Sequence, residues 1–262
     1  MAESRIKVPD NIKEFLEIEN CADFNENRYF VTQDQVDLIK DILRMRKITQ
    51  EMREVHKIDY LNSTLLFGPT GTGKTTLCRY IAHKLDLDFA YVNFAKLVDG
   101  MFGNTARNLD RVFKFMTSIE CIFVLDEIDC IATKRGNESA ASGGELSRIT
   151  ITLMQELDYF KSHKVDSVII GCTNVVDTLD PALRSRFAME KEIRLLSNQE
   201  KEGFLVKYLK DVGIPFSMDN IREYCARNSM VTQRKMESDM IRAIATWLLN
   251  NKEQPFIIKK VI

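Results

Sequence analysis

Short, almost purely apolar runs alternate with amphipathic stretches through the middle of the chain. The runs are STLLFG (63–68), DFAYVNF (88–94), CIFVLD (121–126) and SVIIGCT (167–173). Each run is continuous in apolar residues, which predicts a strand buried on both faces. The stretches at 74–85, 105–119 and 145–160 carry apolar residues at three- and four-residue spacing, which predicts helices. Strands alternating with helices are typical of a parallel sheet covered by helices, so we predict an α/β fold.

The two ends of the chain differ from this middle part. Residues 33–57 have apolar positions at helical spacing, which predicts a long helix with one buried face. From about Ser197 the strand-like runs stop and only helix-like segments follow. We therefore predict a polar leader at 1–32 that packs on the α/β domain, that domain itself at 33–196, and a small helical domain at 197–262.

Composition excludes several classes of protein. The 262 residues are 45% hydrophobic and 29% charged, which is ordinary for a globular protein. Lys plus Arg (37) nearly balance Asp plus Glu (38), so no global field favours nucleic acid or an anionic membrane as the partner. No run approaches eighteen apolar residues and the first residues lack a signal-like apolar region, so we predict a cytoplasmic protein without a membrane partner.

Cysteine and histidine are too scattered to build a metal centre or a disulfide framework. These residues are Cys21, Cys78, Cys121, Cys130, Cys172, Cys225, His56, His83 and His163. No C-x-x-C pair occurs, and the histidines lie far from one another. We therefore interpret the cysteines as buried or surface thiols in a reducing compartment.

The stretch GPTGTGKT (68–75) follows the first apolar run and opens the next helix. It matches the pattern G-x-x-x-x-G-K-[ST], in which glycines let backbone N–H groups surround a phosphate at a helix N-terminus. A glycine-rich turn could match by chance, but the strand before it and the helix after it favour nucleotide binding. The predicted ATP-binding residues here are Gly68, Pro69, Thr70, Gly71, Thr72, Gly73, Lys74, Thr75 and Thr76. Lys74 is expected to reach the β- and γ-phosphates, and the Thr75 hydroxyl to ligate Mg²⁺.

Two acidic residues end the third apolar run. Asp126 is expected at the carboxyl edge of the sheet, where it could hold Mg²⁺, and Glu127 could polarise the attacking water. Asp129 and Glu127 could instead be solvated surface carboxylates, an alternative that the upstream phosphate loop disfavours.

Further polar residues follow the last predicted strand. Asn174 could position water or contact the γ-phosphate, although an Asn after a strand is usually a turn residue. Arg184 and Arg186 could supply positive charge to phosphoryl transfer, although such a pair is more often solvated.

The ordered motifs GPTGTGKT, IFVLDEID, CTN and LDPALRSRF, followed by a helical tail, resemble the AAA+ ATPase family over roughly residues 30–250. DEIDCIATKR with TNVVDTLDPAL is similar to the AAA clade of protein-remodelling ATPases. The resemblance implies a P-loop NTPase with a helical lid, built into a ring that is most often a hexamer. The roles it implies are Walker A for Lys74 and Thr75, Walker B for Asp126 and Glu127, sensor 1 for Asn174, and arginine fingers acting on a neighbouring subunit for Arg184 and Arg186.

The chain departs from the clade in two motifs. Arg184-Ser185-Arg186-Phe187 is shorter than the clade's L-R-P-G-R-F, which leaves open which arginine is the finger; we favour Arg186. Gln155 and Glu156 stand where the clade usually has Asp-Gly, which predicts altered signalling between subunits.

The resemblance also points to client and adenine contacts. Met101, Phe102 and Gly103 occupy the position of the pore loop that grips a threaded chain, although they could simply pack under a loop, and 133–145 occupies that of a second pore loop. Phe30 and Val31, beside Tyr29, are candidate adenine contacts, with a hydrophobic staple into the following helix as the alternative. Arg234 and Lys235 could approach the phosphates as a sensor 2, although a solvated basic face fits them better.

Together these features predict a ring-forming homo-oligomer that couples Mg²⁺-dependent ATP hydrolysis to remodelling or threading of a macromolecular client, with protein favoured. The alternative is a nucleic-acid-associated ATPase, such as a helicase or clamp loader or a phage or mobile-element accessory ATPase. A nucleotide-gated scaffold with little turnover is disfavoured because every catalytic position is filled.

Overall fold

The computed structural model describes residues 6–98, 105–131, 143–163, 167–250 and 255–258. The chain divides into two compact units. The first unit consists of residues 1–24, 37–68 and 74–192. The second consists of residues 25–36, 69–73 and 193–262.

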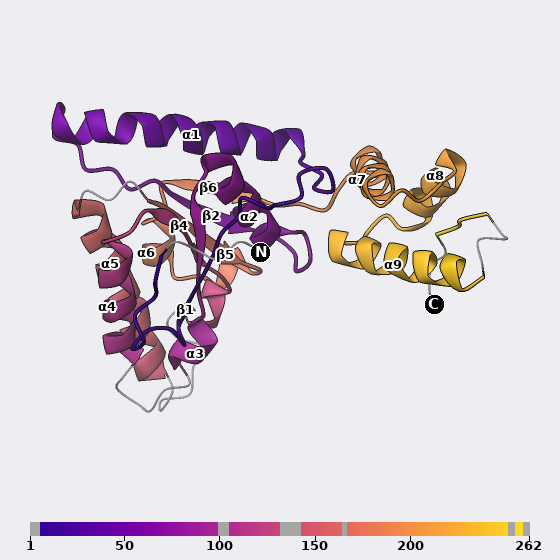
Figure 1. Ribbon diagram of the computed structural model, residues 1–262. Coiled ribbons are helices and arrows are strands. Elements are labelled where there is room, and N and C mark those ends of the chain that lie inside the picture. The colour runs from indigo at the N-terminus through magenta and orange to yellow at the C-terminus, as the bar shows by residue number, and fades with distance from the viewer. Residues whose placement is uncertain (1–5, 99–104, 132–142, 164–166, 251–254, 259–262) are drawn as a thin grey trace. The chain divides into compact units, whose positions relative to one another are not determined.

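A mostly parallel sheet forms the centre of the first unit (Figure 1). Across the described residues it has six strands in the order β1-β3-β4-β5-β2-β6. The strands are β1 Leu16–Glu19, β2 Ser63–Phe67, β3 Asp88–Val92, β4 Cys121–Leu125, β5 Val168–Thr173 and β6 Met189–Glu192. Strands β2 to β5 are the four predicted from their apolar runs, and β2 to β6 run parallel to one another, which confirms the predicted α/β fold.

The two edge strands are absent from the sequence-based prediction. β1 comes from the predicted leader and pairs antiparallel with β3, with Leu16 opposite Val92. β6 pairs only with β2 in the described sheet, and its residues alternate between half-buried and exposed. Because an edge strand is short and partly solvated, its sequence lacks the continuous apolar run that identified the central strands.

Helices surround the sheet. Those of the α/β part are α1 Gln33–Glu54, α2 Lys74–Leu85, α3 Phe94–Val98, α4 Thr105–Met116, α5 Gly143–Ser162 and α6 Pro181–Arg184, with short 3₁₀ turns η1 Ile128–Cys130 and η2 Val176–Thr178. α2 packs on β3, β4 and β5, and α4 lies beside α5 (Figure 1). Phe160 of α5 makes edge-on contacts with Phe113 and Phe123, at ring-centroid distances of 6.2 and 5.9 Å. These buried aromatic rings tie α4 and α5 to β4.

The predicted helices and strands differ from the observed ones mainly at their ends. The first long helix ends at Glu54 rather than near Lys57, and the helix predicted to reach residue 119 ends at Met116. The strand predicted over 88–94 stops at Val92, because Asn93 accepts a hydrogen bond from the Lys96 N–H as an N-cap does and α3 begins.

The second unit contains the three helices predicted near the C-terminus. They are α7 Asn198–Asp211, α8 Met218–Arg227 and α9 Gln233–Leu249. Its buried core includes Leu205, Leu209, Ile221, Cys225, Met236 and Met240. Phe30 packs against this core, so part of the predicted leader belongs to the second unit. The domain boundaries and the lid role of these helices stay predictions.

Candidate functional site

Neighbouring strands of the sheet end where the predicted site residues begin. Parallel pairing of β2 with β5 places Phe67 opposite Thr173. Gly68 and Asn174 therefore leave the sheet side by side. β4 pairs with the other side of β5, and Asp126 follows its last residue. The carboxyl ends of parallel strands meet at one edge, which is where open α/β sheets bind ligands.

The connection from β2 to α2 has the backbone that a phosphate loop requires. Gly68, Gly71 and Gly73 have φ angles of 144°, 80° and 86°, in a region that residues with a Cβ rarely occupy. The Thr72 hydroxyl, buried, donates to the Pro69 carbonyl oxygen at 2.9 Å and stabilises the turn. Pro69, Thr70 and Thr76 are exposed.

The Lys74 ammonium group is held at the start of α2. Lys74 is 7% exposed, and its Nζ donates to the Gly68 carbonyl oxygen at 2.7 Å. The same Nζ donates to Oδ1 of Asn174 at 2.8 Å. The structure thus brings together the lysine and the asparagine that the sequence predicted for one site, although 100 residues separate them.

Thr75 and Asp126 also meet. The Thr75 Oγ1 hydroxyl donates to Oδ2 of Asp126 at 2.6 Å, and the Glu127 N–H donates to Oδ1 at 2.9 Å. A hydroxyl and a carboxylate form an all-oxygen donor pair, which is the kind that Mg²⁺ prefers. Burial raises the pKa of the nearby Tyr91 hydroxyl, and the Asp126 and Glu127 carboxylates raise it further.

Glu127 has an exposed side chain and an unusual backbone. Its φ of 53° and ψ of 39° are left-handed, which is uncommon for a residue other than glycine and frequent at functional sites. It caps η1, and Asp129 of this turn accepts a hydrogen bond on Oδ1 from the Asn174 N–H at 3.3 Å. Partial burial, with Asp129 and Glu127 nearby, raises the pKa of the Cys130 thiol to about 11.

The two arginines of the stretch Arg184-Ser185-Arg186-Phe187 each have a carboxylate partner. Arg184 donates through Nε and Nη2 to the two oxygens of Glu190 at 2.7 and 2.5 Å, which raises the pKa of Arg184 and lowers that of Glu190. Arg186 donates to the Ala182 carbonyl oxygen at 2.8 Å and to Oδ2 of Asp158 at 3.1 Å.

Phe187, which ends the same four-residue stretch, has a buried ring that explains a glycine in β5. A Cβ on Gly171 would lie 2.6 Å from the Phe187 ring. Gly171 therefore leaves room for this aromatic anchor, which lies next to Arg186 in the chain. The next residue of β5, Cys172, has a buried thiol whose Sγ is 3.8 Å from Sγ of Cys78 in α2.

In the second unit, the start of α9 contacts the phosphate loop through the main chain. The Arg234 N–H donates to the Gly71 carbonyl oxygen at 3.1 Å, and a Cβ on Gly71 would lie 3.1 Å from Thr232 Oγ1. Lys235 Nζ pairs with Asp239 Oδ1 at 2.5 Å. Arg234 thus reaches the loop by its backbone, and Lys235 is engaged within α9.

Two groups of predicted residues stay untested. Met101, Phe102 and Gly103 lie outside the described residues. The Phe30 ring, a candidate adenine contact next to Val31, packs on Gly203 of α7 within the second unit. Both adenine contacts stay predictions.

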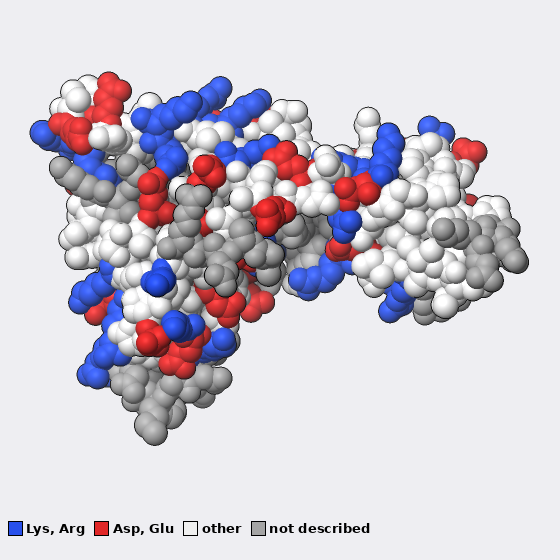
Figure 2. Space-filling view, viewed as in Figure 1, with Lys and Arg blue, Asp and Glu red and all other residues white. Residues whose placement is uncertain are grey.

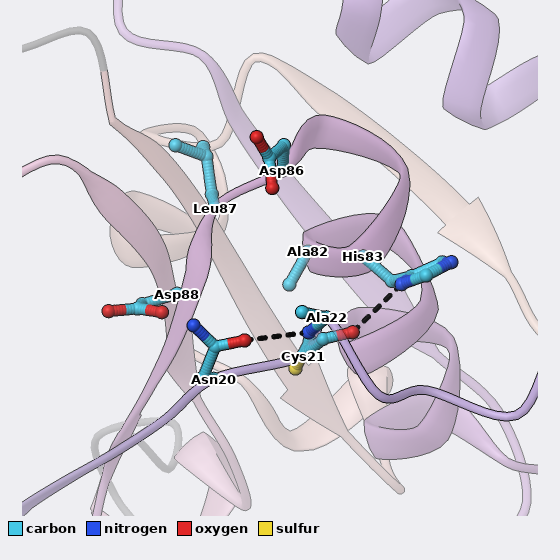
Figure 3. Close-up of a pocket in the computed structure, with 8 residues that line it drawn as sticks. All are labelled: Asn20, Cys21, Ala22, Ala82, His83, Asp86, Leu87 and Asp88. Carbon is cyan, nitrogen blue, oxygen red and sulfur yellow. Dashed lines mark hydrogen bonds between the residues drawn. The ribbon is translucent and has the colours of Figure 1, made fainter. Parts of the chain in front are cut away.

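A separate cavity of about 180 Å³ lies in the first unit (Figure 3). It is lined by Asn20, Cys21, Ala22, Ala82, His83, Asp86, Leu87 and Asp88. The His83 ring nitrogen Nδ1 lies 2.8 Å from the Cys21 carbonyl oxygen, and Oδ1 of Asn20 accepts from the Ala22 N–H at 2.7 Å. None of the predicted site residues lines this cavity.

Two negative findings apply to the part of the chain that the structure describes. It contains no group of three or more His, Cys, Asp or Glu side chains placed to hold a metal ion. A Mg²⁺ ion at Thr75 and Asp126 would therefore need further ligands from nucleotide phosphates or water. Likewise, no helix in the described residues combines the length and apolar character needed to cross a membrane.

Comparison with known proteins gives one family. The family model described as "ATPase family associated with various cellular activities (AAA)" matches residues 64–195, half of the chain. This match covers Lys74, Thr75, Asp126, Asn174 and both arginines.

Curated relatives match a similar region. A probable 26S proteasome regulatory subunit 10B of Caenorhabditis elegans is 33% identical over 176 residues, which cover 66% of this chain and 43% of that protein. The 26S proteasome regulatory subunit 8 of Dictyostelium discoideum is 33% identical over 187 residues, 70% of this chain and 46% of the relative. The peroxisomal ATPase PEX6 of the same organism is 37% identical over 140 residues, 53% of this chain and 12% of the relative. The chain spans less than half the length of these relatives.

Proposed function

This chain belongs to the AAA family of ATPases, and from that premise we propose that it hydrolyses ATP at the carboxyl edge of its sheet. The observation that carries the proposal is the convergence of Lys74, Thr75, Asp126 and Asn174, which come from three separate segments. Each of these hydrogen bonds, taken alone, is also what an ordinary structural contact would give, and it is their combination that indicates a site. A glycine loop at a helix N-terminus beside a lysine, a hydroxyl and a carboxylate is the set that triphosphate binding needs.

The residues have distinct proposed roles. Main-chain N–H groups of the loop and the Lys74 ammonium would bind the β- and γ-phosphates and offset their charge. Thr75 and Asp126 would hold Mg²⁺, which would supply positive charge that offsets the negative charge of the phosphates. Glu127 would align the attacking water, and Asn174 would fix the γ-phosphate or that water.

We propose that the active form is a homo-oligomeric ring, in which Arg186 of one subunit completes the site of the next. This arrangement follows the family resemblance, and hexamers are the expected size. The helices of the second unit would act as a lid over the nucleotide, with Phe30 and Val31 near the adenine and Arg234 beside the loop.

We propose a protein as the client. The support comes from the relatives, which are two regulatory subunits of the 26S proteasome and a peroxisomal ATPase. Side chains of both signs appear on the face in Figure 2, and Lys plus Arg (37) nearly balance Asp plus Glu (38) in the chain, which does not favour nucleic acid as the partner. Met101, Phe102 and Gly103 would contact the client in the pore.

ATP turnover by the purified chain, with Mg²⁺ and with EDTA, tests the proposal. Wild type should hydrolyse ATP only with Mg²⁺, and Lys74→Ala should lose both ATP affinity and turnover. Lys96→Ala is a matched control, because this exposed lysine pairs with Glu17 on the surface. Wild type that fails to bind Mg·ATP, or an unchanged Lys74→Ala, would refute the assignment.

A second assay distinguishes a protein client from a nucleic-acid client. Turnover should rise with an unfolded protein and not with single-stranded DNA. Stimulation by DNA alone would overturn the protein assignment while leaving the ATPase intact.

A further inference from the structure

The Asp129 side chain contacts Asn174, the residue that directly follows β5. Its Oδ1 accepts a hydrogen bond from the Asn174 N–H at 3.3 Å, across 45 residues of sequence. Asn174 is the first residue after β5, and the next N–H, of Val175, turns back to Thr173 Oγ1 at 3.1 Å. The Asp129 carboxylate therefore ties the exit of β5 to a different segment of the first unit.

Asp129 is a well-fixed anchor. It lies in η1, where the Cys130 N–H donates to the Glu127 carbonyl oxygen at 2.9 Å. Ile128 and Ile131, on either side of this turn, are fully buried. Ile128 also abuts β5, since a Cβ on Gly171 would lie 3.2 Å from its Cδ1. Buried apolar contacts of this kind hold a polar side chain in a defined place.

The side-chain amide of Asn174 contacts Lys74, the lysine proposed to bind phosphate. Its Oδ1 accepts from Lys74 Nζ at 2.8 Å, and Lys74 also donates to the Gly68 carbonyl oxygen at 2.7 Å. A line of hydrogen bonds thus runs from Asp129 through the backbone of Asn174 to its amide and on to Lys74. Displacement of the Asn174 backbone would move the amide away from the lysine and from any γ-phosphate there.

We propose that Asp129 is a positioning residue, which holds the Asn174 backbone so that the Asn174 amide is aligned with Lys74 and the phosphates. Its effect on turnover rests on the proposed ATPase function. This role requires an oxygen at position 129 that accepts a hydrogen bond from the Asn174 N–H. The negative charge of the Asp129 carboxylate is less important for it. This separates Asp129 from Asp126 and Glu127, whose proposed roles need a charge.

Turnover tests the role. Asp129→Ala should lower kcat on the order of tenfold, the loss of one hydrogen bond to a charged group, and change KM for ATP less. Asp129→Asn keeps an oxygen that can accept from the Asn174 N–H and should retain most activity. Asn174→Ala should show a similar loss, and the double variant should be no worse than either single one. Asp177→Ala, which removes an exposed carboxylate from the same connection, is the matched control.

Hydrogen exchange of the Asn174 amide gives a readout that does not depend on turnover. In the nucleotide-free full chain, Asp129→Ala should accelerate this exchange while the amides of β4 stay protected, and Asp129→Asn and Asp177→Ala should match wild type. Unchanged exchange in Asp129→Ala, additive kcat losses with Asn174→Ala, or an Asp129→Asn as impaired as Asp129→Ala would each overturn the proposal. A wild type without ATPase activity would refute the proposed function instead, and the exchange result would still decide the role of Asp129.

Discussion

The Thr75 hydroxyl and the Asp126 carboxylate lie 2.6 Å apart although 51 residues separate them in the chain. A hydroxyl that donates to a carboxylate makes a short, charge-assisted bond. Thr75 lies in the first turn of α2 and Asp126 directly after β4, so the parallel order of the strands places them together. The fold therefore assembles an oxygen pair at the entrance of the helix that follows the glycine loop.

Removal of the Thr75 hydroxyl should weaken metal-dependent turnover. Thr75→Ala deletes one proposed Mg²⁺ ligand, whereas Thr75→Ser keeps the hydroxyl. We expect Thr75→Ala to need more Mg²⁺ for half-maximal ATPase and to lose on the order of tenfold in kcat, because metal-coordinating groups act on transition-state charge. Turnover measured across a Mg²⁺ titration checks this, and a Thr75→Ala variant as active as Thr75→Ser would contradict the role.

Glu127 should be needed for hydrolysis and dispensable for binding. Glu127→Gln keeps the size of the side chain and removes its ability to take a proton. We expect ATP affinity close to wild type and a fall in kcat of at least about 100-fold, the scale of a lost general base. Equilibrium binding and single-turnover hydrolysis of ATP measure the two effects separately. Asp177→Asn, an exposed carboxylate elsewhere in the first unit, is the control; normal hydrolysis by Glu127→Gln would refute the role.

The central fold could be predicted because β2 to β5 are buried on both faces. Burial on two sides forces a continuous apolar run, and this run is visible in the sequence. β6 illustrates the limit: Glu190, Lys191 and Glu192 are strongly polar, and the strand exists because β2 offers a free edge to pair with. Pairing between distant segments leaves no local pattern, which also explains why the sequence of Leu16–Glu19 does not predict a strand.

Some residues of the candidate site could likewise be predicted from the sequence, and others could not. Lys74, Thr75 and Asp126 follow a motif whose spacing is fixed by phosphate and metal chemistry, so sequence could identify them. The contact of Asp129 with Asn174 depends on how η1 turns after β4 and has no such motif. Its one cue was the position of Asp129 three residues after Asp126, which a single 3₁₀ turn brings back toward the strand ends.

Arg186 and Arg184 should differ in mixed assemblies. Arg184 is held by both oxygens of Glu190, whereas Arg186 donates to one oxygen of Asp158 and to a carbonyl. If Arg186 acts on a neighbouring subunit, subunits carrying Arg186→Ala should regain activity when mixed with Lys74→Ala subunits, because some interfaces then contain an intact pair. ATPase rates of verified mixed assemblies measure this.

The same mixture with Arg184→Ala serves as the comparison. Recovery there but not with Arg186→Ala would assign the finger to Arg184. Absence of recovery in both mixtures would argue against a shared site.

Gly203 should resist replacement although it lies within α7. Alanine normally stabilises a helix interior by about 1 kcal/mol relative to glycine. Here a Cβ would lie 2.5 Å from the Phe30 ring, so overpacking should outweigh that gain and destabilise the second unit by about 1 kcal/mol. Urea unfolding followed by fluorescence of Trp247, the single tryptophan, reports on this unit. Gly203→Ala should become neutral or stabilising in a Phe30→Leu background, and equal destabilisation in both backgrounds would contradict the contact.

Glu200 should make the second unit sensitive to acid. Two bonds from Arg194, at 2.7 and 2.8 Å, with a further bond from the Ser197 N–H, lower the pKa of the Glu200 carboxyl from 4.5 to about 2. A carboxyl with a lowered pKa in the folded state contributes stability above its unfolded pKa, and that contribution is lost as the pH falls toward the folded value. The difference in unfolding free energy between wild type and Glu200→Gln should therefore be largest above pH 4.5 and shrink between pH 4.5 and 2.

Trp247 fluorescence in urea at a series of pH values measures this difference. Arg194→Gln should remove most of the pH dependence attributed to Glu200, because the guanidinium group is the main cause of the pKa shift. Combination of the two substitutions should add little to either one, since both break the same pair. A difference between wild type and Glu200→Gln that stays constant across this pH range would show that the pair with Arg194 does not hold Glu200 ionised in the folded chain.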